Sequence, residues 1–160
     1  MSERAGALAS RFEAENDGMI ATVEGCSDSQ WQMICAGEQR PVAVVAHHVA
    51  AAYKVVCGWV ETVATEQTLP ELTHAKIDEI NAKHATRFAS PTRDDTLALL
   101  RSGGAAAASM VRGFSDEQLD RTGTMPLFDG YTLTAEQVIK RVLIGHARGH
   151  HADIVRTLGG

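Results

Sequence analysis

Histidine is the commonest metal ligand in proteins, and in this chain it is concentrated in two short segments. Of the seven histidines, His47 and His48 are adjacent, and His146, His150 and His151 fall within GHARGHH. On an α-helix, His146 and His150 lie one turn apart with Cβ atoms about 6 Å from each other, so one divalent ion could bind both imidazoles. The HxxxH spacing alone is a weak signal, and a third ligand from a facing helix would strengthen it.

A helical wheel predicts where a third ligand comes from. With 100° between successive residues, His48 falls on the apolar face of the second long helix, whereas His47 falls on a polar line. The apolar face carries Val45, Ala52, Val55, Val56 and Trp59, and the polar line carries Arg40, Lys54 and Glu61. His146 and His150 share the apolar face of the last helix, and His151 points aside. We therefore expect the imidazoles of His48, His146 and His150 to meet in the core.

Three imidazoles buried together need a partner, because an unpaired polar group in the interior is costly. A divalent cation is the simplest one, and three protein ligands leave coordination positions open, as in catalytic sites. The alternative, which holds for a lone histidine, is that each imidazole is an ordinary core or boundary side chain. Asp153, three residues after His150, is predicted to hydrogen-bond an imidazole N–H of a ligand. The alternative for Asp153 is a solvated carboxylate near a helix end.

Length, charge and cysteine content restrict the class of protein. The chain has 160 residues, a mass of 17.1 kDa and a net charge of −5, which predicts one domain over residues 1–160. We expect no nucleic-acid partner, because no basic cluster offers phosphates a cationic face. We expect no membrane span, because the most apolar stretch, residues 42–60, contains His47, His48 and Lys54. Three cysteines without a CxxC motif and an early-charged N-terminus indicate a cytoplasmic protein.

Long helices must position these histidines, and the apolar periodicity predicts four of them. They cover residues 2–23, 41–65, about 92 to 114, and 134–158, with shorter elements at 27–31, 77–88 and after Ser115. Capping boxes, Ser115 with Gln118 and Thr134 with Gln137, mark two helix starts. The pair Gly103-Gly104 weakens the third long helix, and residues 123–132 have turn and strand character. The predicted fold class is an all-α four-helix bundle with short extra helices.

Several stretches resemble the DinB/YfiT-like metal-dependent superfamily. PVAVVAHHVA (41–50) is similar to its second-helix signature, and GHARGHH (145–151) to the HxxxH of its fourth helix. SDSQW, SPTRDDTLALL and FSDEQL agree with the same pattern, so the resemblance spans nearly the whole chain. It is strongest toward the branch that contains the N-terminal domain of mycothiol-dependent maleylpyruvate isomerases.

The resemblance implies an up-down-down-up bundle that binds one divalent metal ion, zinc or nickel, through His48, His146 and His150. It also implies a homodimer and a thiol transferase or isomerase reaction with mycothiol or bacillithiol. We accordingly expect a metal-bound thiolate or water to attack a small-molecule electrophile, although the sequence leaves open whether the protein is an enzyme. The alternative is a non-catalytic small-molecule-binding or dimeric interaction module of the same fold.

Overall fold

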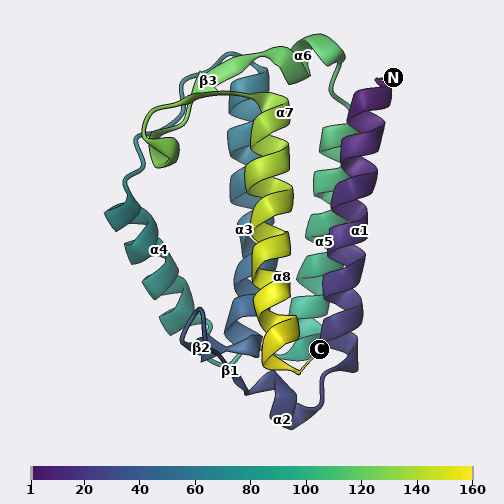
Figure 1. Cartoon of the computed structure of the whole chain (residues 1–160), viewed down its shortest axis with the longest axis vertical. Helices are drawn as coiled ribbons and strands as arrows, with labels where there is room; N and C mark the ends of the chain where they lie inside the picture. The colour runs from purple at the N-terminus through teal and green to yellow at the C-terminus, as the bar shows by residue number, and fades with distance from the viewer. Residues whose placement is uncertain (1, 160) are drawn as a thin grey trace.

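Four long helical rods lie side by side in the computed structural model, which describes residues 2–159 (Figure 1). The rods are α1 (Glu3–Gly25), α3 (Val42–Ala64), α5 (Arg93–Arg112), and a continuous rod of α7 (Ala135–Val138), η2 (Ile139–Ile144) and α8 (Gly145–Thr157). The short helices are α2 (Asp28–Trp31), α4 (His74–Arg87), α6 (Asp116–Asp120) and η1 (Pro126–Phe128). Two small antiparallel hairpins complete the fold, β1 (Ile34–Cys35) with β2 (Arg40–Pro41), and β3 (Thr122–Thr124) with β4 (Thr132–Thr134).

The order of the rods confirms the predicted up-down-down-up topology. Helix α4 carries the chain from the end of α3 back along the bundle, so α3 and α5 run in the same direction and antiparallel to α1 (Figure 1). The rod of α7 to α8 then runs parallel to α1. Helix α4 itself stands off the bundle beside α3, and none of its residues is buried. Its position leaves room for a pocket between α4 and the bundle.

The helix boundaries follow the capping signals of the sequence. Both predicted capping boxes are present, at Ser115 with Gln118 and at Thr134 with Gln137. Helix α1 continues through Gly25, two residues past its predicted end, and Pro41 serves as the N-cap of α3 and not as its first residue. Helix α4 begins earlier than predicted, at His74, where the preceding Thr73 caps it.

The Gly103-Gly104 pair does not interrupt α5, contrary to what the helix propensity of glycine suggests. A Cβ on Gly104 would lie 2.2 Å from Asn16 Nδ2 of α1, so the missing side chain makes room for that amide. Buried Asn16 donates to Leu100 O at 3.0 Å and accepts from the Tyr53 hydroxyl at 2.8 Å. One buried polar side chain therefore links α1, α3 and α5 inside a largely apolar core.

Helix α3 is the central element of that core. In residues 2–159 it is the one helix long and apolar enough to cross a membrane by length and composition, yet 56% of its most apolar stretch is buried inside the bundle. It contacts α5, the rod of α7 to α8, and α4, and its Tyr53 ring packs edge-on against Phe12 of α1 at 5.0 Å. By these contacts α3 is a core helix of the bundle. Its polar residues His47, His48 and Lys54 also fit this role better than a membrane span.

Candidate metal centre

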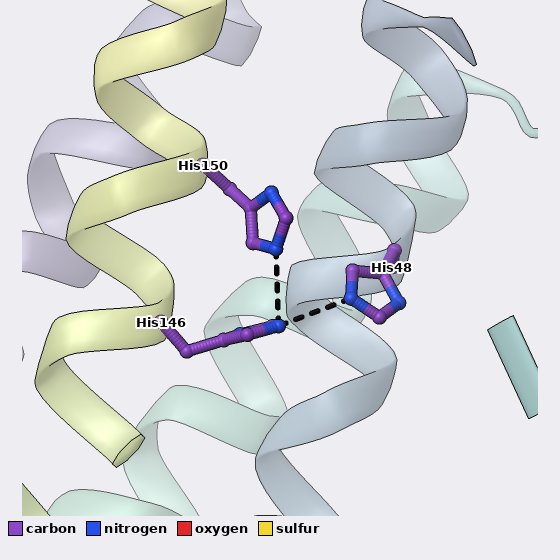
Figure 2. Close-up of side chains that lie close together, drawn as sticks. All are labelled: His48, His146 and His150. Atoms are coloured by element: carbon purple, nitrogen blue, oxygen red, sulfur yellow. Dashed lines mark hydrogen bonds between the residues drawn. The ribbon is translucent and has the colours of Figure 1, made fainter. Parts of the chain in front are cut away.

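The predicted histidine trio is brought together between α3 and α8 (Figure 2). His146 Nε2 lies 3.0 Å from His48 Nε2 and 3.1 Å from His150 Nε2. All three ligand atoms lie within 4.8 Å of one another. Nitrogens that bind one zinc ion at about 2.0–2.1 Å would stand roughly 3 Å apart, so this spacing fits a shared divalent ion.

Hydrogen bonding alone cannot satisfy the three facing nitrogens. Each imidazole nitrogen has one in-plane position, which holds either a proton or a lone pair. His146 Nε2 faces the Nε2 atoms of both His48 and His150, and a single proton cannot lie on both lines at once. One cation bonded to three lone pairs satisfies all three nitrogens together. The chemistry of the donor set therefore fits a metal ion.

The rings are held in the neutral form that a metal ion requires. Burial, together with the positive charge that neighbouring His146 and His150 would carry, lowers the pKa of His48 to about 3. Burial and the proximity of His150 lower the pKa of His146 to about 4. At neutral pH both imidazoles therefore offer lone pairs, and protons do not compete for them.

Glu38 orients the third ligand, and the sequence did not reveal it. Its Oε1 lies 2.9 Å from His150 Nδ1, on the side of the ring opposite the trio. A carboxylate there accepts the Nδ1–H and leaves the lone pair on Nε2, where an ion binds. Glu38 lies in the turn between β1 and β2, next to the start of α3. No helical periodicity relates a turn residue to a ligand, so only the folded structure pairs them.

Asp153, the predicted hydrogen-bond partner of an imidazole, does not fill that role. Its Oδ1 accepts from Arg156 one turn along α8, at 3.2 Å. Within residues 2–159, its buried Oδ2 has no hydrogen-bond partner, and no imidazole reaches it. The prediction is wrong because the Asp153 carboxylate packs against Gly37 of the β1–β2 turn and not against an imidazole. The contact is so close that a Cβ on Gly37 would lie 3.0 Å from Asp153 Oδ2.

His47 lies outside the trio, as predicted, but it is buried, unlike the other residues of its polar line. Lys54 and Glu61 on its wheel line are exposed, as expected, but His47 is only 4% exposed. Helix α4 and the Phe88 that follows it cover that face: His47 Nδ1 lies 2.8 Å from His84 Nε2, and the His47 ring centroid lies 4.3 Å from that of Phe88, with the two planes tilted by 32°. Burial, with the nearby His47 and Arg40, lowers the pKa of His84 to about 4.

The remaining histidine of the second segment agrees with its prediction. His151 points away from the trio and lies 2.8 Å from the Thr22 hydroxyl of α1. The rod that carries this second segment also differs from a regular helix, since η2 is a π-helical segment directly before Gly145. Such segments are rare and occur often at functional sites. Here the widened turn immediately precedes His146.

The trio forms one end of a pocket of about 740 Å³ between α3, α4 and the last rod. Most of its wall is apolar, including Val55, Trp59, Leu72, Ile80 and Phe128. His84 of α4 also lines it. A smaller hollow of about 340 Å³ shares Glu38, His146 and His150 with the large pocket. The two ligands of α8 are therefore accessible from two directions.

Solved structures with the same fold include three at low sequence identity. YfiT from Bacillus subtilis, described as a probable metal-dependent hydrolase with an unusual four-helix bundle topology, is 18% identical with a TM-score of 0.78, covering 99% of this chain and 90% of that one. A mycothiol-dependent maleylpyruvate isomerase is 13% identical with a TM-score of 0.71, covering 96% of this chain. This chain spans 63% of the length of that isomerase. An uncharacterized protein from Clostridium difficile 630 is 14% identical with a TM-score of 0.73, covering 98% and 96%.

At these identities the structural likeness shows the shared fold. No curated protein sequence gives a significant match. Residues 11–154, which include both histidine segments, match the sequence pattern of one family. By that match, and in agreement with the fold, this chain belongs to the DinB superfamily.

Proposed function

We propose that this protein is a metal-dependent enzyme whose divalent ion is bound by His48, His146 and His150. The observation that carries the proposal is the convergence of three Nε2 atoms whose spacing fits one ion and whose hydrogen bonds cannot all be made at once. A bound zinc or nickel ion supplies Lewis acidity, which lowers the pKa of a coordinated water or thiol toward neutrality. Held by these three histidines, such an ion would activate a water or thiol toward an electrophile in the adjoining pocket.

The protein side chains prepare this chemistry in three ways. Burial keeps the imidazoles of His48 and His146 neutral at neutral pH. Glu38 holds the His150 ring in the orientation that presents Nε2. The largely apolar wall of the pocket offers the apolar part of a substrate a binding surface beside the trio. With three protein ligands, coordination positions remain for the nucleophile.

A thiol nucleophile in this site has to come from a cosubstrate. Within residues 2–159, no cysteine lines the pocket. Burial raises the pKa of Cys57 to about 11, and it also raises the pKa of Cys26 and Cys35. Such thiols are poor nucleophiles at neutral pH. A low-molecular-weight thiol of the mycothiol or bacillithiol type is therefore the thiol cosubstrate we propose, in line with the mycothiol-dependent isomerase of the same fold.

Metal content tests the proposal directly. Protein purified without an affinity tag, soaked in zinc or nickel and then dialysed, is expected to retain about one equivalent of metal by mass spectrometry. His150→Ala removes most of the retained metal. His151→Ala is the matched control, since that ring is adjacent in sequence but contacts Thr22. Retention below a tenth of an equivalent, or an equal loss in both variants, would overturn the ligand assignment.

A spectroscopic titration distinguishes a thiol reaction from hydrolysis and from non-catalytic binding. Cobalt-loaded protein is titrated with millimolar thiol, and a thiol that enters the coordination sphere changes the visible and near-ultraviolet spectrum. This change is expected if the protein is a thiol transferase or isomerase. An unchanged spectrum rejects the thiol reaction and leaves hydrolysis by water or a non-catalytic binding module.

A further inference from the structure

The large pocket combines an apolar wall with one cationic side chain. Val55 and Ile80, on α3 and α4, remain 55% and 45% exposed although they face this pocket. Together with Trp59, Leu72 and Phe128 they form an apolar wall. Binding of an apolar ligand is favourable there because it removes the apolar surface of both from water. A volume of about 740 Å³ is that of a typical small-molecule site. The pocket therefore accommodates a bulky apolar molecule.

Arg40 is the cation of this pocket, and no carboxylate neutralises it. Other arginines lie beside an acid, as Arg93 does beside Asp28 at 2.6 Å, whereas within residues 2–159 no acidic side chain forms an ion pair with Arg40. Arg11, Arg87 and Arg141 also lack an acidic partner, but they are exposed, while Arg40 is half-buried and lines the pocket.

The position of Arg40 within the pocket is beside the histidines. Arg40 lines the same pocket as His48 and His84, and it lies two residues along the chain from Glu38, whose carboxylate contacts His150. The pocket's carboxylate, Glu38, is already engaged by His150. An anionic group would therefore find one cationic, bidentate hydrogen-bond donor at the histidine end of the cavity.

We propose that the pocket binds an amphipathic organic anion, with its apolar body between α3 and α4 and its carboxylate-type group on Arg40. Within the proposed function, on which this assignment rests for its catalytic meaning, this molecule is the electrophilic substrate. The sugar-containing thiol proposed as cosubstrate is a poor occupant of this apolar space, because its hydroxyl groups would be buried against aliphatic walls without hydrogen-bond partners. The smaller hollow, which is also lined by His146 and His150, gives that thiol a separate approach to the trio. The substrate class is thus an apolar acid.

Fluorescence titration with three pyrene probes tests this assignment on the full chain. The acid 1-pyrenebutyrate has the expected body and charge, and 1-pyrenebutanol lacks the charge. In 8-hydroxypyrene-1,3,6-trisulfonate the same ring carries three charged sulfonates, which an apolar wall cannot bury. Saturable binding of the acid is expected to be roughly tenfold tighter than that of the alcohol, the advantage of one charge-assisted hydrogen-bonded pair. The trisulfonate is expected not to bind. Equal affinity for acid and alcohol, or binding of the trisulfonate alone, would overturn the proposal.

Substitutions in the pocket test which side chains bind the pyrene probes. Arg40→Gln is expected to abolish the tenfold preference for the acid while leaving alcohol binding unchanged, and Arg40→Lys restores part of it. Arg11→Gln, an exposed arginine on α1 without an acidic partner, is the control that leaves both affinities unchanged. Ala52→Phe fills the pocket and weakens both probes, with circular dichroism confirming that the variant is folded. Acid preference that survives Arg40→Gln contradicts the role of Arg40.

The same titration in EDTA separates this proposal from the metal site. Acid binding that persists in EDTA supports recognition by Arg40 even if the protein retains no metal. Loss of acid preference in EDTA means that the ion, and not Arg40, receives the carboxylate, which overturns this assignment while leaving the metal proposal intact. A second readout is hydrogen exchange in α4, which contains no buried residue and is expected to slow when the acid binds.

Discussion

At the scale of single residues, substitution of Glu38 tests whether its hydrogen bond to His150 orients that metal ligand. Glu38→Ala removes the acceptor of the His150 Nδ1–H and is expected to weaken zinc affinity roughly ten- to a hundredfold, measured by competition with a chelator. Glu38→Gln retains an acceptor oxygen and should lose less. Glu61→Gln, an exposed carboxylate on α3, is the control. Unchanged affinity in Glu38→Ala would show that the contact does not orient the ligand.

The low histidine pKa values predict how stability depends on pH at the same scale. His48 and His146 have pKa values of about 3 and 4 in the folded chain against 6.5 when unfolded. The unfolded chain therefore binds more protons below pH 6.5, and the metal-free protein loses stability as pH falls from about 6.5 toward 4. The loss is up to roughly 1.4 kcal/mol per pH unit for each histidine. Urea unfolding at pH 7, 6 and 5 measures it, and His146→Asn should reduce the slope; an identical slope would contradict this assignment.

At the scale of elements, two neighbouring glycines of α5 make a matched pair. Gly104→Ala places a Cβ on the Asn16 amide, breaks its bond to Leu100, and is expected to destabilise the protein by about 2 kcal/mol or more. At Gly103 the nearest atom to a Cβ is Tyr53 Cδ2 at 3.6 Å, an ordinary contact. Gly103→Ala is therefore expected to stabilise the helix by up to about 1 kcal/mol. Equal effects in thermal unfolding would contradict the α1–α5 packing described here.

The elements also show what the sequence could predict. Helices and capping boxes depend on neighbours in sequence, so Ser115 with Gln118 and the faces of His48 and His146 were predictable from spacing alone. The burial of His47 was not, because it depends on α4, whose own apolar pattern is weak. Glu38 was hidden for a similar reason, since a turn residue reaches its partner only through the tertiary fold.

At the scale of the whole molecule, the apolar core is one cluster that does not include the three histidines. Phe12, Val49, Leu100 and Ile139, from the four rods, are each fully buried in one apolar cluster. EDTA is therefore expected to leave the far-ultraviolet circular dichroism unchanged, while zinc at a hundred times its dissociation constant stabilises the fold by about 2.7 kcal/mol. His150→Ala should lose that stabilisation. Unfolding in EDTA would instead make the metal structural.

The homodimer stays a prediction, which analytical ultracentrifugation tests.

The central claim is that three imidazoles from two helices bind one ion. A crystal of zinc-soaked protein, with diffraction data collected at the zinc absorption edge, tests it most directly. We predict one strong anomalous peak within about 2.0–2.1 Å of Nε2 of His48, His146 and His150, with a further coordination position facing the pocket. A peak bound elsewhere, or no peak between these three rings, would contradict the account.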